Sequence, residues 1–312
     1  MEGVSDVARQ LGNDLEVVEP EPAATAALTR VHSASYLRQL EEFCHAGAGS
    51  LDPDTFARPD SWDAALLSAG AGLQAVEVLR RRGTGVAFVA TRPPGHHALA
   101  ERAMGFCLLN NVAVSAAALV ADGERVLIVD WDVHHGNGTQ DLFWDDPSVL
   151  YVSTHQSPFY PGTGGADEVG GEGARGLTLN VPLPAGTTGD VVRRALDEVA
   201  APVIDEFSPT WVLVSAGFDA HRADPLAELA LSSADFADLA RTVAGFAPAP
   251  GRLVLFLEGG YDLGALRSSV AATLGALSGA AEAGDGERPT SGGPGAEFVA
   301  GAAALRARTL GD

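Results

Sequence analysis

The sequence predicts a single α/β domain with a mostly parallel, doubly wound sheet flanked by helices. One observation is a set of five short apolar runs bounded by polar or glycine residues, which is typical of buried parallel strands. Another is that the segments between them carry apolar residues at three- and four-residue spacing and are long enough for helices. Strands that alternate with helices indicate βαβ units and hence a parallel sheet. The predicted strands are 86–90, 126–131, 149–153, 211–216 and 253–257, and the predicted helices are 63–82, 108–121, 189–206 and 233–246.

Composition narrows the class of protein. The chain has 312 residues, 46% of them hydrophobic, and no apolar run approaches the ~20 residues that a membrane span needs. The N-terminus lacks a basic region before an apolar stretch, and only Cys44 and Cys107 are present, so we expect neither a secretory signal nor a disulfide framework. These features predict a cytoplasmic protein with no membrane partner. The formal net charge of −21 argues against a nucleic-acid partner.

The end of the chain is expected to lie outside the main domain, which would span residues 1–277. Residues 278–297 are rich in Gly, Ala, Pro and Glu, a composition that predicts a flexible connector. Residues 298–312 follow it, with a short terminal helix predicted over 298–310.

Chemically distinctive residues gather where the predicted strands end. Parallel sheets bind ligands in a crevice beyond the carboxyl ends of their strands. Histidines scattered through a core would not concentrate in such loops. Six of the eight histidines do so, namely His96, His97, His134, His135, His155 and His221.

The segment Asp130-Trp-Asp-Val-His134 is the strongest candidate for a metal site. Strand alternation would place Asp130, Asp132 and His134 on one face, and two carboxylates with an imidazole suit a divalent metal such as zinc. Asp219, in a glycine-led turn after another strand, is the candidate third ligand. Three protein ligands would leave an open position for water or substrate, as in catalytic zinc sites. The alternative is that these residues are ordinary polar caps of strand ends, helices or turns.

The adjacent residues His96 and His97 are candidates for proton transfer, because histidine titrates near neutral pH. Asp130 and Asn137 flank the metal motif at places suited to orienting a histidine. Tyr261, which follows two glycines, can donate its hydroxyl to a developing oxyanion. The alternatives are a chance surface pair of histidines and a tyrosine that only packs.

Two large aromatic residues, Phe106 and Tyr160, fall in predicted loops. They are suited to form the walls of a narrow apolar channel for an alkyl chain. Packing within their own loops is the alternative interpretation.

Six motifs, in their order and spacing, resemble the zinc-dependent histone deacetylase superfamily, which has the arginase–deacetylase fold. The resemblance covers about residues 25–275. With asparagine at position 137, the chain resembles the class II branch and its bacterial amidohydrolase relatives. The motifs are Arg92-Pro-Pro-Gly-His-His-Ala98, Gly105-Phe-Cys-Leu-Leu-Asn-Asn111, Asp130-Trp-Asp-Val-His-His-Gly-Asn-Gly-Thr-Gln140, Tyr160-Pro-Gly-Thr-Gly164, Gly217-Phe-Asp-Ala-His221 and Glu258-Gly-Gly-Tyr261.

The resemblance implies two kinds of metal site. Zinc (Zn²⁺) would be bound by Asp132, His134 and Asp219. Structural potassium (K⁺) is also bound by members of the superfamily. One potassium site is matched by Asp130, Asp132, His134, Ser153 and Thr154, and a second by Phe143, Asp146 and Val149.

The resemblance also implies a role for the other matching residues in hydrolysis of an N-acyl amide. His97 would act as general base and acid, and His96, paired with Asp130, as its electrostatic partner. Tyr261 would donate to the oxyanion. The walls of an acyl-lysine tunnel would be Phe106 and Tyr160, and the Gly105 carbonyl would accept the substrate amide proton.

The implied substrate is an acetylated protein or a small acetylated amine. Polyamine-selective relatives place an acidic residue where this chain has Leu226, so acetyl-lysine in proteins is the favoured substrate. The alternatives are an acetylpolyamine amidohydrolase and a catalytically silent acyl-lysine-binding scaffold. An arginase-type ureohydrolase would need two metals, and Asn137 counts against it.

The start of the chain departs from the superfamily pattern. Relatives open with a strand and a His-Pro-Glu-type segment before a helix that here would begin near Val4. This chain lacks both, which predicts a truncated start and is the one feature that favours the silent-scaffold alternative.

Overall fold

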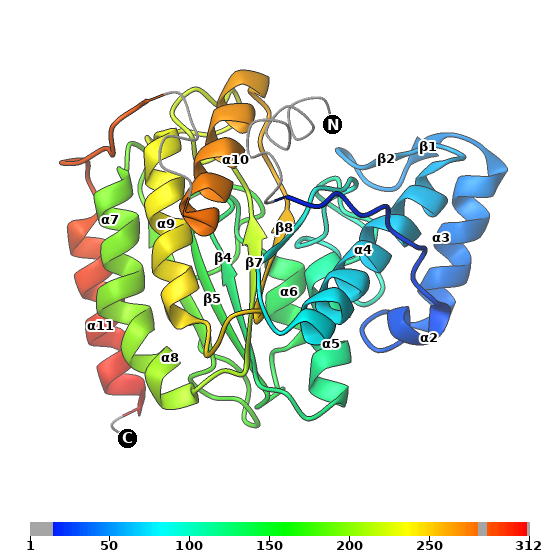
Figure 1. The fold of residues 1–312 in the computed structure, drawn as a ribbon, viewed down its shortest axis with the longest axis horizontal. Coiled ribbons are helices and arrows are strands. Elements are labelled where there is room, and N and C mark those ends of the chain that lie inside the picture. The colour runs from blue at the N-terminus through cyan, green and yellow to red at the C-terminus, as the bar shows by residue number, and fades with distance from the viewer. Residues whose placement is uncertain (1–14, 280–285, 311–312) are drawn as a thin grey trace.

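The structure is a computed structural model that describes residues 15–279 and 286–310 (Figure 1). Its centre is a six-stranded sheet in the order β3-β8-β7-β4-β5-β6, in which every neighbouring pair is parallel. All five predicted strands are present, and the predicted α/β class is confirmed. The strands are β3 (Ala87–Val89), β4 (Val126–Asp130), β5 (Val149–Gln156), β6 (Thr178–Leu183), β7 (Trp211–Ala216) and β8 (Leu253–Leu257).

Strand β6 is missing from the predicted strands. Its sequence contains Asn180 and Pro182, residue types that are uncommon in strands. The strand lies at the edge of the sheet, where a proline is tolerated because one side of the strand has no partner. Asn180 is buried, and its Nδ2 donates to Gln140 Oε1 at 2.7 Å, so the donor half of its amide is satisfied.

Helices cover both faces of the sheet (Figure 1). One face is covered by α2 (Thr25–Leu28), α3 (Ala34–Ala46), α4 (Ser61–Arg82) and α5 (Asn111–Ala121). The other is covered by α7 (Gly189–Arg194), a π-helical segment (Ala195–Ala200), α8 (Ala201–Phe207), α9 (Ser233–Phe246), α10 (Leu263–Ser278) and α11 (Ala296–Leu310). The short elements are α6 (Asn137–Leu142) and an antiparallel pair, β1 (Gly49–Ser50) and β2 (Phe56–Ala57). Within the described ranges, no helix is long and apolar enough to cross a membrane.

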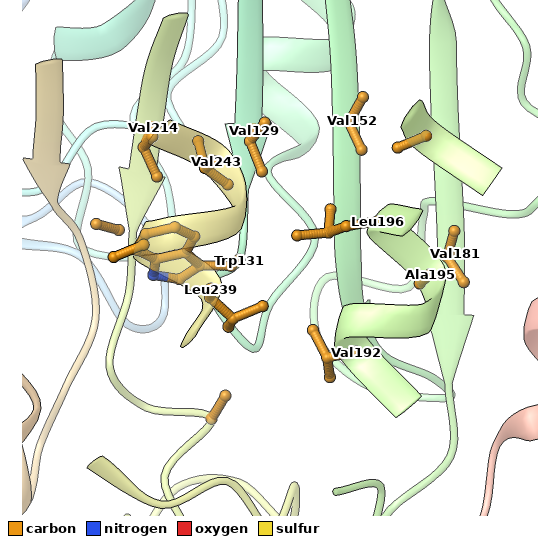
Figure 2. Packing of buried hydrophobic residues seen from close by; sticks show 14 of the residues in the cluster. Val129, Trp131, Val152, Val181, Val192, Ala195, Leu196, Val214, Leu239 and Val243 are labelled. Atoms are coloured by element: carbon orange, nitrogen blue, oxygen red, sulfur yellow. The ribbon is translucent and has the colours of Figure 1, made fainter. Parts of the chain in front are cut away.

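The core consists of two apolar clusters, one on each face of the sheet. In β4, Leu127 and Val129 belong to the cluster under α7–α11, whereas Ile128 belongs to the cluster under α2–α5. Figure 2 shows Leu196 of the π-helical segment projecting toward Val152 on β5. Because both faces are buried, these strands have no polar face, which is why they are continuous apolar runs in the sequence.

Polar caps set where two helices begin. Asn110 Oδ1 accepts a hydrogen bond from Ala113 N at 3.0 Å, so α5 starts at Asn111 and not at the predicted residue 108. Asp262 Oδ1 accepts from Ala265 N at 2.7 Å and caps α10 in the same way. This cap leaves Tyr261 in the loop between β8 and α10, at the carboxyl edge of the sheet.

The part of the predicted connector that the structure describes makes hydrogen bonds to the rest of the molecule. Thr290 N donates to Asp235 Oδ1 at 3.1 Å, and Glu287 Oε2 accepts from Ser233 N at 3.0 Å. Residues 280–285 of this connector, and the helix predicted near Val4, lie outside the described residues. The division of the chain into a domain and a connector stays a prediction.

His32 is a buried histidine that fixes the start of α5. Its Nδ1 lies 3.0 Å from the Leu99 carbonyl oxygen, and Asn110 N donates to its Nε2 at 2.9 Å. The ring therefore uses one nitrogen as donor and the other as acceptor, which only the neutral form can do. Burial lowers the pKa of His32 from 6.5 to about 4, although the backbone carbonyls of Leu99 and Ala100 oppose this shift.

We predict that folding stability falls in mild acid partly because of His32. The unfolded state takes up a proton near pH 6.5, before the folded state does, so the contribution is complete above pH 6.5 and is lost as the pH falls toward 4. The contribution of His32 to the free energy of unfolding is on the order of 3 kcal/mol. Denaturant unfolding between pH 7 and 4 should give a shallower pH dependence for His32→Gln than for the wild type. Equal slopes for the two proteins would contradict the assignment.

Candidate active site

The carboxyl ends of the parallel strands bring the predicted site residues to one edge of the sheet. In the strand register, Asp130 at the end of β4 pairs with Ser153 of β5 and with Ser215 of β7. The loops that follow β3, β4, β5, β7 and β8 all contribute to a pocket beyond this edge. Its lining residues are Asp54, Pro94, His96, His97, Gly105, Phe106, His134, Tyr160, Leu226, Gly259 and Tyr261.

Asp132, His134 and Asp219 form a compact set of metal-ligand atoms. One ligand atom from each residue lies within 4.8 Å of the others. His134 Nδ1 lies 3.0 Å from Asp132 Oδ1 and 3.3 Å from Asp219 Oδ2. Asp219 Oδ2 is buried and accepts no hydrogen bond, which leaves its lone pairs available to a cation. Two carboxylates and an imidazole in this arrangement fit a divalent metal with an open coordination position.

Backbone N–H groups hold the two carboxylates in place. Gly259 N donates to Asp132 Oδ2 at 2.8 Å, and Val133 N donates to Asp219 Oδ1 at 3.0 Å. Burial would lower the pKa of His134, but the neighbouring carboxylates of Asp132 and Asp219 outweigh it and raise that pKa to about 10. The imidazole thus lies among negatively charged groups.

His96 and His97 are both buried in the lining of the pocket, with their ring centroids 4.0 Å apart. His96 Nδ1 lies 3.0 Å from Asp130 Oδ2, and His97 Nδ1 lies 2.8 Å from Asn137 Oδ1. The structure thus pairs His96 with Asp130, as the resemblance implies, and brings His97 to Asn137, the other candidate orienting residue. An amide oxygen can only accept, so the proton of neutral His97 is on Nδ1 and its Nε2 is left as the proton acceptor.

The two histidines favour different protonation states. Burial would lower the pKa of His96, but the charges of three nearby carboxylates hold that pKa well above its usual range. Burial lowers the pKa of His97 well below its usual range, and the charge on His96 lowers it further. At neutral pH, His96 is the cation and His97 is the neutral base. The three carboxylates are Asp130, Asp132 and Glu258.

Glu258 is a buried site residue to which the sequence analysis assigns no role. Its Oε2 accepts from Gly95 N at 2.6 Å and from His96 N at 3.2 Å, and its Oε1 accepts from Ser215 Oγ at 3.2 Å. Burial raises the pKa of Glu258 to about 7. The sequence did offer one signal for Glu258, which is its place directly after β8. Residues that follow the other strands are also functional candidates.

Aromatic rings form the walls of the pocket, as predicted for Phe106 and Tyr160. Tyr160 stands perpendicular to His97 with 5.2 Å between ring centroids, and Phe106 lies 6.0 Å from Tyr261. Phe106 has a φ of 65°, a left-handed conformation that is uncommon for a bulky residue. Its N–H donates to Thr55 Oγ1 at 3.0 Å, and this bond helps to hold the strained loop.

The sequence predicted some of the remaining pocket residues and not others. Gly105 and Leu226 line the pocket as expected, and Leu226 is 46% exposed. Asp54 and Pro94 also line it, and Phe159 stacks on His134 with 5.2 Å between ring centroids. Pro94 lies in the first of the six motifs, whereas no strand or charge pattern in the sequence connects Asp54 or Phe159 to the metal motif.

The two potassium sites stay predictions. Of the first set, Ser153 and Thr154 are buried on β5, and Ser153 Oγ lies 2.9 Å from His155 Nδ1. Of the second set, Asp146 N donates to the Phe143 carbonyl at 3.1 Å, within the turn between α6 and β5. The structure places the members of each set near one another in the fold.

Comparisons with known proteins agree with this geometry. The sequence profile of the histone deacetylase domain matches residues 3–277. The chain belongs to the histone deacetylase family. A probable deacetylase of Archaeoglobus fulgidus is 41% identical over 267 residues, which cover 84% of this chain and 74% of that protein. The histone deacetylase-like amidohydrolase of Pseudomonas aeruginosa is 41% identical over 253 residues, with coverages of 80% and 67%.

A solved structure supports the same assignment. The crystal structure of the HDA15 HD domain superposes with a TM-score of 0.90 at 34% sequence identity, and covers 98% of this chain and 86% of its own. Membership of the histone deacetylase family and the arginase–deacetylase fold, both expected from the six motifs, are confirmed. The protein is therefore a hydrolase of the deacetylase and amidohydrolase class, in a family that is generally metal-dependent.

We predict that Gly259→Ala destroys the metal site without a direct change to any ligand. A Cβ at this position would lie 1.9 Å from Asp219 Oδ2 and 2.8 Å from Asp132 Oδ2, so both carboxylates must move. Elemental analysis after dialysis against zinc should show about one zinc per chain in the wild type and a small fraction of that in the variant. Gly245→Ala is the control, because a Cβ there meets no atom within 4 Å. Full zinc content in Gly259→Ala would contradict the site.

Proposed function

We propose that the protein is a zinc-dependent amidohydrolase whose substrate is acetyl-lysine in proteins. The observation that carries this proposal is the convergence of three groups on one pocket. The three are the metal-ligand set of Asp132, His134 and Asp219, which reaches the pocket through His134, the neutral base His97, and Tyr261. Relatives named as deacetylases and as a histone deacetylase-like amidohydrolase support the same reaction class.

The donor set favours zinc among divalent metals. One imidazole and two carboxylates, with an open fourth position, match catalytic zinc better than the all-oxygen environment preferred by magnesium or calcium. When bound, zinc would supply Lewis-acid chemistry, by polarising an amide carbonyl and by making water more acidic.

The residues of this chain would manage the proton and the developing negative charge. His97 Nε2 accepts the proton of the attacking water, while Asn137 holds the other nitrogen of the ring. The same nitrogen then donates that proton to the departing amine. His96, held as a cation by Asp130, stabilises the negative charge that builds up beside His97. Tyr261 donates its hydroxyl to the carbonyl oxygen as negative charge develops there.

The walls of the pocket bear on the choice of substrate. Leu226 and Phe106 are half-exposed at the pocket and offer apolar surface to the uncharged chain around an acyl-lysine. Asp54 lines the same pocket, and its carboxylate favours the second candidate function, hydrolysis of acetylated polyamines. The Asp54 oxygen Oδ1 already accepts hydrogen bonds from Gly105 N at 3.2 Å and from Thr55 Oγ1 at 3.0 Å. Because this carboxylate is engaged in holding the loop, we favour acetyl-lysine.

Tyr261→Phe tests the reaction directly. The wild type should hydrolyse an acetyl-lysine peptide, and the variant should lose roughly 10²–10³ in kcat because one oxyanion donor is removed. Tyr36→Phe is the matched control, since the Tyr36 hydroxyl donates to the Leu108 carbonyl away from the pocket. Wild-type protein that binds acyl-lysine but hydrolyses no acyl amide would support the silent scaffold instead.

Replacement of the two histidines should lower kcat/KM by different amounts. His97→Ala should reduce kcat/KM more than His96→Ala, because His97 exchanges the proton and His96 acts through its charge. The dependence of kcat/KM on pH should be bell-shaped. Its acidic limb should lie below pH 6.5, since burial and the charge on His96 lower the pKa of the base. Equal and small losses for both variants would exclude these roles.

Leu226→Glu should shift preference toward polyamines. A carboxylate at this half-exposed position can pair with a distal ammonium, but such a pair contributes about 1 kcal/mol or less, a change of several-fold. Steady-state kinetics with an acetyl-lysine peptide and with acetylspermidine, run side by side, measure the shift. If the unmodified protein already prefers acetylspermidine, the second candidate function replaces the first.

A further inference from the structure

Asp224 is a buried carboxylate that connects two walls of the pocket. It is 7% exposed and lies in the loop between β7 and α9, five residues after Asp219. Its Oδ2 accepts a hydrogen bond from Tyr261 N at 2.7 Å, and its Oδ1 accepts from Leu226 N at 2.9 Å. One side chain therefore holds the backbone of two residues that line the pocket.

The backbone before Tyr261 needs an external support. Gly260 has a φ of 136°, a conformation that glycine adopts readily and other residues rarely do. Asp262 uses its own carboxylate to cap α10 through Ala265 N. The Asp224 carboxylate also receives a longer bond, of 3.4 Å, from Asp262 N. A buried hydrogen bond from an N–H to a charged acceptor is stronger than one between neutral groups, so Asp224 is well suited to fix this turn.

The loop that carries Asp224 is itself held in place. Asp224 N donates to the His221 carbonyl at 2.8 Å, and Ala223 N donates to His221 Nδ1 at 3.1 Å. His221 Nε2 lies 3.3 Å from Glu287 Oε2, in the segment that follows α10. The Asp224 carboxylate is thus anchored on the side away from the pocket, and can position the residues on the pocket side.

We propose that Asp224 is a positioning residue that fixes the Tyr261 hydroxyl over the metal site. The inference rests on the proposed function, because it acts through the oxyanion donor of that reaction. An oxyanion donor must lie within about 0.5 Å of its productive position, and a misplacement of about 1 Å can cost roughly 10²-fold in rate. Loss of the Asp224 bond should therefore affect turnover while the metal ligands stay in place.

Hydrogen–deuterium exchange tests the positioning without any enzymatic assay. In Asp224→Asn, the side-chain amide has one oxygen, so it cannot accept from both Tyr261 N and Leu226 N. Exchange in a peptide covering residues 257–263 should become faster than in the wild type, and Asp224→Ala should show a larger effect. Asp235→Asn is the matched control, because Asp235 is also buried and accepts from Ser232 N and Thr290 N, but does not contact Tyr261.

A double-variant cycle tests whether the effect on catalysis passes through Tyr261. Asp224→Asn should lower kcat on an acetyl-lysine peptide by roughly 10- to 100-fold, with KM changed less than threefold. The same substitution in the Tyr261→Phe background should cost less than threefold, since no hydroxyl remains to be positioned. Asp235→Asn should lower the melting temperature and leave kcat unchanged. The Asn variant keeps the shape of the side chain, so it decides the question if Asp224→Ala does not fold.

Three results would overturn the proposal. One is unchanged exchange in residues 257–263, another is an equal loss of kcat in the two backgrounds, and the third is a change confined to KM. Failure of the proposed function has a different signature, in which the wild type hydrolyses no acyl amide. The exchange measurement would still show in that case whether Asp224 fixes Tyr261.

Discussion

Four carboxylates, those of Asp130, Asp132, Asp219 and Glu258, are buried at one edge of the sheet, and the cost of burying their charge constrains everything around them. An isolated buried carboxylate is strongly disfavoured, so each must be paired, protonated or bound to a metal. Burial raises the pKa of Glu258 to about 7, and burial together with the charge on Asp132 raises that of Asp219 to about 6. A divalent cation at the metal-ligand set would add to the positive charge of His96 at this edge.

The parallel sheet allows this many carboxylates to be buried close together. Every strand points its carboxyl end to the same edge, so the loops can surround the carboxylates with backbone N–H groups, while the faces of the sheet remain apolar. Glycines allow the close approach that this requires. A Cβ on Gly217 would lie 2.1 Å from Asp132 Oδ2, and Gly259 approaches the same carboxylate from β8. The ligand geometry therefore depends on backbone packing as much as on the ligands themselves.

Much of this arrangement could be predicted from the sequence, because strong local patterns carry it. The five continuous apolar runs identify strands of the sheet, and the motifs at their ends contain the candidate metal ligands, His97 and Tyr261. Strand β6 escaped prediction because Asn180 and Pro182 disfavour a strand unless it lies at an edge, and edge position is a property of the whole sheet. Helix α10 is absent from the predicted helices because it lacks a clear apolar stripe. Small and apolar residues occur on all of its sides.

Site residues that act through long-range contacts could not be predicted with equal success. Asp54 reaches the pocket, and Phe159 stacks on His134, only because their loops fold toward the metal-ligand set, and Asp54 belongs to no pattern tied to a strand end. Glu258 stood in a recognised motif, but its role depends on Gly95, which is 163 residues away in the chain. The spacing of residues in a sequence predicts local periodicity well, but it carries little information on contacts between residues far apart in the chain.

The segment after α10 has a consequence for where this protein can be divided. The matched family region ends at residue 277, yet Glu287 contacts both His221 and Arg222, in the loop that carries Asp224. Thr290 also contacts Asp235 at the start of α9. A fragment cut at residue 277 would keep every proposed metal ligand and catalytic residue, but it would expose the buried His221 ring and release one anchor of the pocket wall. The contacts that hold the pocket wall therefore continue beyond the last residue of the matched family region.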